Sequence, residues 1–194
     1  MPVKNLGQKK NELRLKYKKI REEFSREEKA ELDKKITERF LNLEQYQSAK
    51  NVFAFVSKDI EVNTEDIIIN ALESGKKVAV PLCDIGSTTM YFCYINSYDD
   101  LKEGCYGILE PDRSKCIRAE KNDADIMLVP GLVFDKKGYR LGFGKGFYDR
   151  FMCEYNRLTV GVCYSKCIED ELPIGDYDKP SDMVVTDRYT IDIR

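Results

Sequence analysis

Apolar residues recur at helical spacing through the first forty positions of the chain. One such face is formed by Leu13, Tyr17, Ile20 and Phe24. A second face is formed by Leu32, Ile36, Phe40 and Leu43. Positions three or four apart lie on the same side of a helix, so two helices are predicted here. Between them, Ser25 followed by Glu28 predicts a capping box at the start of the second helix.

After residue 50 the pattern changes to short apolar runs bounded by polar residues, which predict strands. These runs cover 51–56, 77–83, 90–95, 124–130, 159–164 and 182–186, and we expect the last of them to be the final strand. Helices are predicted between some of them, one starting at Thr64 and stopping at Gly75 and another opening at 147–155. The run 124–130 is expected to lead into a glycine-rich stretch.

Strands alternate with helices, and most strands are continuous apolar runs without strict in-and-out alternation. This pattern is typical of an α/β three-layer domain with a mainly parallel sheet flanked by helices. In such sheets a ligand binds beyond the carboxyl ends of the strands. No internal repeat or linker divides the sequence, so residues 1–194 are expected to form a single domain.

Composition narrows the possible partners and compartment. The 194 residues are 42% hydrophobic and 34% charged, which is typical of a folded globular protein, and the net charge of -2 gives no general attraction to nucleic acid or to an anionic membrane. No apolar run approaches the ~20 residues of a membrane span, and the N-terminus has no apolar signal core. We therefore expect a cytoplasmic protein without membrane or nucleic-acid partners. The seven cysteines include no CxxC pair and are expected to be reduced packing residues.

The chain contains no histidine. This excludes Ser-His-Asp and Cys-His catalysis, histidine-ligated zinc and a histidine general base. Any chemistry must therefore use Lys, Arg, Asp, Glu, Tyr, a metal or the substrate itself.

The stretch RLGFGKGFYDR, residues 140–150, carries three glycines and two cations, Arg140 and Lys145. It is not a P-loop, because the first glycine of that motif would fall on Tyr139 and no hydroxyl follows the lysine. It also lacks the third glycine of the dinucleotide fingerprint, since Phe147 occupies that position. Glycines nonetheless allow a backbone nest for an anion, so the stretch indicates a phosphate site. The alternative is a flexible surface loop.

Two further features adjoin this hypothesis. Asp149 follows the glycines, where it could either bind magnesium beside a phosphate or only complement a helix dipole. On a helical wheel Lys10, Arg14 and Arg21 fall within about 40° of one another, beside the apolar face. Such a stripe places cations at the edge of an interface, although a solvated charged face is the better interpretation for Arg21 and remains open for the other two.

Four segments together resemble the 5-formyltetrahydrofolate cyclo-ligase family, whose enzymes are also called 5,10-methenyltetrahydrofolate synthetases. They are KNELR, EVNTEDII, VPGLVFDKKGYRLGFGKGFYD and DYDKPSDMVVT, in the same order as in the family. The third is long and specific, and the others are individually weak. The resemblance implies a NagB/RpiA-like fold and an enzyme that uses ATP and Mg2+ to convert 5-formyltetrahydrofolate to 5,10-methenyltetrahydrofolate. We expect a monomer.

The resemblance also implies roles for individual residues. ATP contacts are implied for Lys10, Arg14, Arg140, Gly142, Gly144, Lys145, Gly146, Phe147 and Tyr148, with Arg140 and Lys145 as the catalytic cations. Substrate contacts are implied for Val56, Glu61, Tyr106, Phe143 and Tyr148. Magnesium ligands are implied at Asp149 and Asp178. Three of these positions depart from the common pattern of the family: Tyr106 replaces Trp, Phe143 replaces Arg or Tyr, and Phe147 replaces Tyr.

The implied chemistry suits a chain without histidine. The formyl oxygen and N10 of the substrate are the nucleophiles, so the protein has to supply positioning and charge neutralisation. Competing interpretations are a small-molecule kinase, a sugar-phosphate isomerase, or a regulatory module that binds ATP without turnover. For single residues, Glu61 is otherwise a surface acid before a helix, and Arg140 otherwise pairs with an acid such as Asp135 and only braces the loop.

Overall fold

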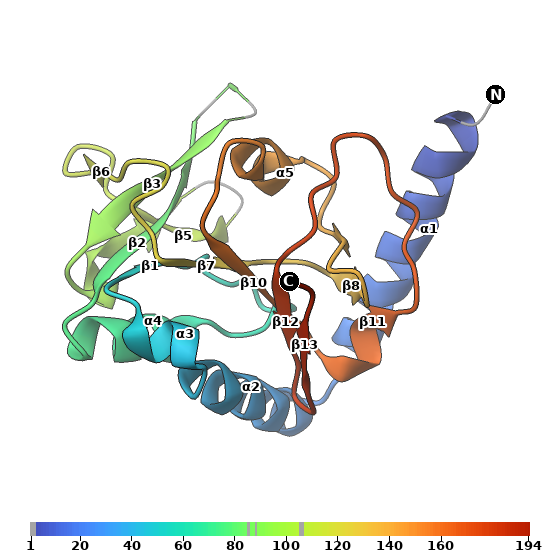
Figure 1. Ribbon diagram of the computed structural model, residues 1–194, viewed down its shortest axis with the longest axis horizontal. Coiled ribbons are helices and arrows are strands. Elements are labelled where there is room, and N and C mark those ends of the chain that lie inside the picture. Colours follow the sequence, from blue (N-terminus) through green and yellow to red (C-terminus); the bar gives the residue numbers. More distant parts are fainter. Residues whose placement is uncertain (1–2, 85, 88, 105–106) are drawn as a thin grey trace.

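The computed structural model describes residues 3–84, 86–87, 89–104 and 107–194. Within these ranges the centre of the molecule is an eight-stranded sheet of order β13-β12-β10-β7-β1-β2-β3-β6 (Figure 1). Its strands are β1 (Asn51–Phe53), β2 (Lys77–Cys83), β3 (Met90–Ile95), β6 (Ile117–Arg118), β7 (Ile126–Val129), β10 (Leu158–Val162), β12 (Met183–Val185) and β13 (Thr190–Asp192).

The five central strands β12, β10, β7, β1 and β2 pair in parallel, and β13, β3 and β6 add antiparallel edges. The predicted mainly parallel sheet is therefore confirmed. The prediction that the segment 182–186 is the last strand is wrong, because β13 follows it and pairs with β12. β13 has only three residues and no apolar run, so its pairing with β12 defines it and its own sequence does not.

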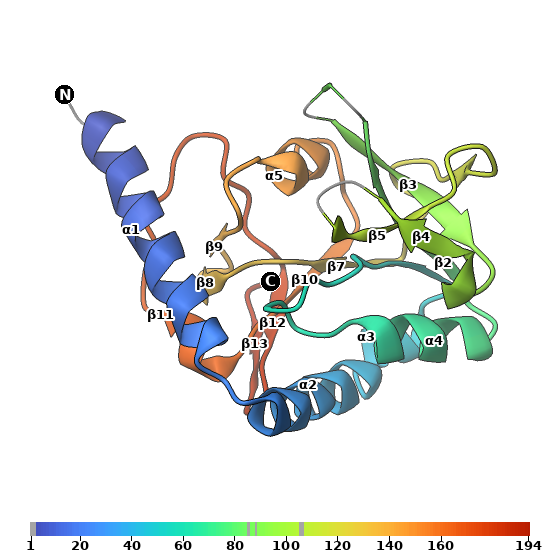
Figure 2. The same cartoon turned by 180° about the vertical axis from the view of Figure 1, so that it is seen from behind.

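Helices cover both faces of the sheet, which confirms the three layers. They are α1 (Val3–Glu22), α2 (Arg26–Leu41), α3 (Glu44–Ser48), α4 (Glu65–Glu73) and α5 (Phe147–Met152). Figures 1 and 2 show α2, α3 and α4 below the sheet, α5 above it, and α1 along one end. Neighbouring strand residues serve the two faces: Val52 joins the core beneath the sheet, whereas Phe53 stacks on Phe92, which in turn packs against Phe151 of α5.

The helix starts follow the sequence with one change of partner. Ser25 Oγ accepts a hydrogen bond from the Glu28 N–H, as predicted, but the Glu28 carboxylate pairs with Lys166 at 2.8 Å. Thr64 is the N-cap residue of α4, yet its hydroxyl donates to the Phe55 carbonyl at 2.6 Å. The α4 helix stops before Gly75, whose φ is +73°.

Short strands outside the central sheet were not predicted. β8 (Val133–Asp135), β9 (Arg140–Leu141) and β11 (Ile168–Glu169) form one small sheet, and β4 (Leu101–Glu103) pairs with β5 (Leu109–Pro111). The segment 124–130 therefore does not lead directly into the glycines, because the β8–β9 hairpin intervenes. Asp135 shapes that hairpin, since its Oδ1 accepts from the backbone N–H groups of Lys137 and Tyr139, both at 2.9 Å.

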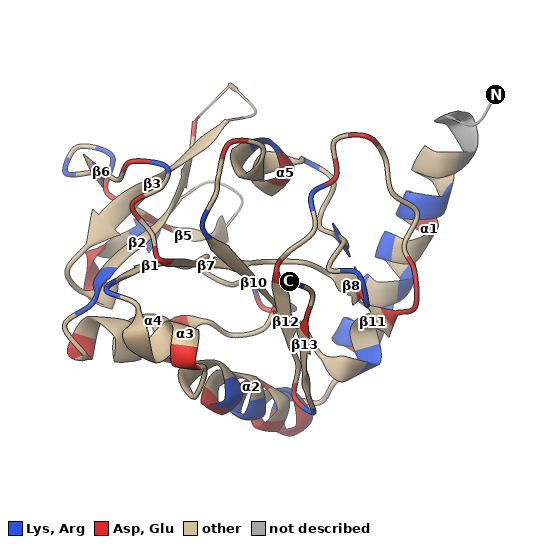
Figure 3. Cartoon of the chain, in the orientation of Figure 1, with Lys and Arg blue, Asp and Glu red and all other residues tan. Residues whose placement is uncertain are grey.

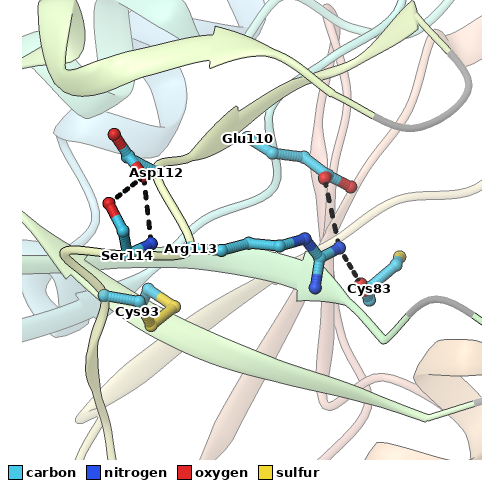
Figure 4. Close-up of a disulfide and its surroundings, with 7 residues drawn as sticks. Cys83, Cys93, Glu110, Asp112, Arg113 and Ser114 are labelled. Atoms are coloured by element: carbon cyan, nitrogen blue, oxygen red, sulfur yellow. Dashed lines mark hydrogen bonds and ion pairs between the residues drawn. A yellow bond between two sulfur atoms is a disulfide. The ribbon is translucent and has the colours of Figure 1, made fainter.

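The cysteines correct one expectation. Cys93 of β3 and Cys116 form a disulfide bond, with 5.4 Å between their Cα atoms (Figure 4), so the prediction that all seven cysteines are reduced is wrong for these two. The antiparallel pairing of β3 with β6 brings them together, and their separation of 23 residues carries no signal in the sequence. Cys163 and Cys167 are buried packing residues, as expected, and Cys105 lies outside the described residues.

Candidate active site

A cavity of about 370 Å³ opens beyond the carboxyl ends of β1, β2 and β7, where a ligand of a parallel sheet is expected. The predicted site residues that line it are Arg14, Val56, Glu61, Arg140, Gly142, Phe143, Gly144, Lys145, Gly146, Phe147, Tyr148, Asp149 and Asp178. Lys10 reaches this group by pairing with Asp178. The remaining predicted residue, Tyr106, lies outside the described residues. Residues far apart in the sequence are thus collected around one cavity of ordinary ligand-binding size.

The glycine loop runs from β9 into α5, and α1 packs against it. Arg14 Nε donates to the Gly142 carbonyl at 2.9 Å, which ties the helix to the start of the loop. Gly144 has φ +93°, a conformation that side chains rarely adopt, and a β-carbon there would lie 3.3 Å from Arg14 Cζ. The predicted cationic stripe of α1 and the glycine loop are therefore two walls of one site.

Arg140 is the most buried cation of the site, with a side chain only 3% exposed. Its Nη2 donates to Asp149 Oδ1 at 3.0 Å and its Nη1 donates to the Lys179 carbonyl at 2.8 Å. Burial lowers the pKa of the Arg140 guanidinium, and the charge of Asp149 opposes that shift. The alternative pairing with Asp135 is wrong, because Asp135 is occupied by backbone N–H groups and Arg140 binds Asp149 instead.

The second predicted metal carboxylate is also paired. Asp178 Oδ2 accepts from Lys10 Nζ and from the Gly175 N–H, the latter at 2.7 Å. The next residue, Lys179, links this carboxylate to the first, because its N–H donates to Asp149 Oδ1 at 3.4 Å. Each carboxylate assigned to magnesium by the resemblance therefore forms an ion pair with a cation assigned to ATP.

These carboxylates fit magnesium better than they fit a metal held by protein alone. In the part of the chain that the structure describes, no three His, Cys, Asp or Glu side chains gather into a metal-binding cluster. Mg2+ is usually bound through one or two carboxylates together with phosphate oxygens and water. Asp149 and Asp178 supply two carboxylates in the same cavity as the phosphate loop, which meets that requirement.

A buried carboxylate and a buried hydroxyl occupy another part of the cavity. Glu61 is 6% exposed, and its Oε2 accepts from the Lys58 N–H at 2.8 Å. Burial raises the pKa of Glu61, opposed by that backbone hydrogen bond and by the charge of Arg21. The Tyr148 hydroxyl is buried without a hydrogen-bond partner among the described residues, and the charge of Glu61 adds to the burial that raises the pKa of Tyr148. Together they offer a ligand one acceptor and one donor.

Arg21 does not belong to the solvated face that the helical wheel favoured. It is 3% exposed, and its guanidinium donates to the carbonyls of Leu132 at 3.1 Å, Ile60 at 3.0 Å and Gly131 at 2.6 Å. Two of these carbonyls follow β7, so Arg21 holds the floor of the cavity in place without facing the ligand. The wheel placed it correctly beside the apolar face, but the depth of its burial depends on contacts more than 100 positions away.

Several cavity residues had no signal in the sequence. They include Lys58, Cys83, Met90 and Glu110. Lys58 Nζ lies 5.1 Å from the centre of the Phe143 ring, so it connects the segment after β1 with the glycine loop. Glu110 lies 3.7 Å from the guanidinium of Arg113, which also donates to the Cys83 carbonyl (Figure 4). Only the position of Lys58 just after a predicted strand would have singled out any of them.

Comparison with known proteins agrees with this geometry. The sequence profile of the 5-formyltetrahydrofolate cyclo-ligase family matches residues 6–187. A probable 5-formyltetrahydrofolate cyclo-ligase of Caenorhabditis elegans is 30% identical over 94% of this chain and 94% of its own. The Haemophilus influenzae 5-formyltetrahydrofolate cyclo-ligase is 30% identical over 89% of this chain and 95% of its own. The solved structure of Aquifex aeolicus 5,10-methenyltetrahydrofolate synthetase superposes with a TM-score of 0.85 at 32% identity, covering 95% of this chain and 93% of that one. With the profile matching nearly its whole length, the chain belongs to the 5-formyltetrahydrofolate cyclo-ligase family.

Proposed function

We propose that this chain converts 5-formyltetrahydrofolate to 5,10-methenyltetrahydrofolate with consumption of ATP and release of ADP and phosphate. The observation that carries the proposal is the single cavity in which a cationic glycine loop meets the buried pair Glu61 and Tyr148. The loop suits a triphosphate, and the buried acceptor and donor suit the amide-like edge of a pterin. Membership of the family supports both assignments.

In the first step the formyl oxygen attacks the γ-phosphorus of ATP, the bond to the ADP oxygen breaks, and the formyl carbon becomes electrophilic. Phosphoryl transfer depends on in-line positioning and on neutralising charge that spreads over the phosphate oxygens. Arg140 and Lys145 are the cations proposed for that task. Lys10 and Arg14 reach the same region from α1 and are proposed to hold the rest of the triphosphate.

Asp149 and Asp178 are proposed as the residues that hold magnesium, which supplies additional positive charge to the phosphate oxygens when bound. Their present partners are cations that the triphosphate would also attract. In the second step N10 of the same substrate molecule attacks the activated carbon, phosphate leaves and N10 loses its proton. Both nucleophiles belong to the substrate, in agreement with a chain that has no histidine.

None of the helices in the described ranges is long and apolar enough to cross a membrane. We propose further that the protein acts in the cytoplasm as a single-domain monomer, on the basis of its composition and its modest net charge of -2. Size-exclusion chromatography with light scattering tests the monomer, which is contradicted by a mass of twice 22.5 kDa or more.

The function is tested by following the absorbance of the methenyl product after mixing protein, 5-formyltetrahydrofolate and Mg-ATP. We expect product to form only when ATP is present, with one ADP released for each product molecule. A small-molecule kinase would release ADP without the methenyl absorbance. A regulatory module would bind ATP with no turnover, and an isomerase would need no ATP. Any of these three outcomes would replace the proposed function.

A further inference from the structure

A second cavity, of about 210 Å³, lies between β3, β6 and α5. Three cations line it, namely Arg118 from β6, Lys121 just after β6 and Arg150 from α5, and none of the described residues lining it is acidic. Figure 3 shows basic residues around β6 and on α5, on a chain whose net charge is negative. We call this cavity the β6–α5 groove.

Each cation of the groove is held against an aromatic ring. The guanidinium carbon of Arg118 lies 4.7 Å from the centre of the Tyr91 ring, and Lys121 Nζ lies 5.3 Å from that of Phe151. The guanidinium carbon of Arg150 lies 5.7 Å from the ring centre of Phe147, the aromatic residue that opens α5. Cation–π contacts of this kind restrain long side chains that would otherwise sweep through solvent. The groove therefore presents its positive charges at defined places.

Little of this charge is neutralised by neighbouring acids. Lys121 pairs with Glu154 at 2.6 Å, and the Glu154 side chain is 79% exposed at the edge of the groove. Arg150 donates to the Lys145 carbonyl at 2.6 Å, a contact that leaves its charge uncompensated. An exposed ion pair contributes little and is readily exchanged for another anion. The groove is thus suited to a ligand with several carboxylates.

The β6–α5 groove adjoins the candidate active site. Met90 and Phe147 line both cavities, so a ligand that fills the first can continue past these two side chains into the second. The folate substrate has a shape that matches this arrangement, because its pterin carries an aminobenzoyl group that ends in glutamate. Folates also occur with chains of several γ-linked glutamates, each adding one carboxylate.

We infer that the β6–α5 groove binds the glutamyl tail of the folate substrate, with Arg118, Lys121 and Arg150 receiving its carboxylates. This inference rests on the proposed function, because it assigns the tail of the same substrate. Arginine suits the task because its planar fork can bind both oxygens of one carboxylate.

The position of the groove argues against the other polyanion of the reaction. The α1 cations proposed for the triphosphate lie at one end of the molecule, whereas β6 lies at the opposite end (Figures 1 and 2). Arg14 contacts the loop at Gly142, before the glycines turn, while Arg150 follows them on α5. The two sets of cations therefore flank the cavity from different sides.

The experiment compares three substrates: 5-formyltetrahydropteroate, which lacks glutamate, 5-formyltetrahydrofolate, and its triglutamate. The double variant Arg118→Gln, Lys121→Gln is expected to raise the KM of the triglutamate by about tenfold or more and that of the monoglutamate by about threefold. The KM of the tail-free substrate and of ATP are expected to stay within twofold of wild type. The control is Lys136→Gln, Lys137→Gln, which removes two exposed lysines of the β8–β9 turn and is expected to alter none of these values.

An equal rise for all three substrates, or no rise for any, would overturn the inference. A selective rise in the KM of ATP would assign the groove to the nucleotide. If the wild-type protein forms no methenyl product from any substrate, the proposed function fails. The groove is then judged by calorimetry without ATP, where it requires that the triglutamate bind wild type more tightly than the monoglutamate does and that the double variant lose the difference.

Discussion

Arg140 Nη2 lies 3.0 Å from Asp149 Oδ1, which pairs a cation proposed to hold phosphate with a carboxylate proposed to hold magnesium. Lys10 and Asp178 repeat the relationship on the other side of the site. Charges removed from water are costly unless they are paired, so this arrangement reduces the cost of keeping four ionised groups around one cavity. Mg-ATP brings a cation and an anion together, and its arrival permits both pairs to exchange partners without leaving a charge uncompensated.

The carboxylates are tested by Asp149→Asn and Asp178→Asn, each of which keeps the shape and removes the charge that holds a hard cation. We expect a higher magnesium requirement and a large loss of turnover in both, measured by magnesium titration of the methenyl assay. The control is Asp170→Asn, which removes an exposed acid paired with Lys136. Unchanged magnesium dependence in both site variants would refute the assignment.

The Arg140→Lys variant retains the charge and loses the fork. A lysine cannot reproduce the two hydrogen bonds to Asp149 and the Lys179 carbonyl. We expect turnover to fall by tenfold to a thousandfold, about 1.4 to 4 kcal/mol, with a smaller effect on ATP affinity. Steady-state kinetics and calorimetry measure the two quantities. If ATP binding weakens as much as turnover slows, Arg140 acts on the ground state and not on the transition state.

The N-terminal helix is tested by two truncations. Removing residues 1–14 eliminates Lys10 and Arg14 but keeps Tyr17 and Arg21, which anchor α1 to the body of the protein. We expect ATP affinity to fall while circular dichroism and cooperative unfolding remain near wild type. Removing only residues 1–9 is the matched control and is expected to preserve ATP affinity. Native affinity in the longer truncation would show that the two cations serve only the surface.

Arg21→Ala is expected to lower the free energy of unfolding by about 3 kcal/mol or more, because it leaves buried carbonyls after β7 without donors. Urea denaturation followed by fluorescence or circular dichroism measures the change. Lys18→Ala is the control, since Lys18 is 53% exposed and lies 3.7 Å from Glu22. A loss no larger than that of the control would mean that the Arg21 hydrogen bonds add nothing to stability.

Glu61 gives a pH-dependent prediction. Its pKa is raised above the ordinary 4.5 by burial, so the folded state retains a proton that the unfolded state releases between that value and the raised one. Stability contributed by this residue is therefore present at low pH and is lost as the pH rises through the raised pKa. Glu61→Gln should be more stable than wild type at pH 7 to 8, with the gain vanishing toward pH 4. It should also raise the KM of the folate substrate.

A flat stability difference across that pH range would show that Glu61 does not titrate as its burial indicates. Asp187→Asn is not expected to reproduce the pattern, because the Asp187 carboxylate accepts hydrogen bonds from the Ser165 N–H at 2.6 Å and the Ser165 hydroxyl at 2.8 Å. Comparing the two variants in parallel urea titrations separates the effect of an unpaired buried acid from that of a hydrogen-bonded one.

Local pattern was sufficient for the features that local physics determines. The apolar runs of β2, β3 and β10 and the caps of α2 and α4 follow from neighbouring residues, and all were predicted. The glycine loop was also recognisable, because positive φ and close backbone approach require glycine wherever they occur.

Pairings across long separations were not predictable. Arg140 was expected to bind phosphate or Asp135, yet the acid it contacts lies at position 149, after the turn of the loop. Arg21 was favoured as a surface residue, but carbonyls more than 100 positions away bury it. The Cys93–Cys116 bond likewise depends on the register of β3 with β6. In each case the partner is selected by tertiary packing and has no periodic signature.

The contact between Lys10 and Asp178 spans 168 positions of the chain. During synthesis, Lys10 leaves the ribosome long before Asp178 is added, so the nascent helix α1 must wait without its partner. A chain released early would retain the glycine loop but not the pairing that orders the helix beside it. Interrupted translation products should therefore lack nucleotide affinity, which would keep incomplete copies from sequestering ATP.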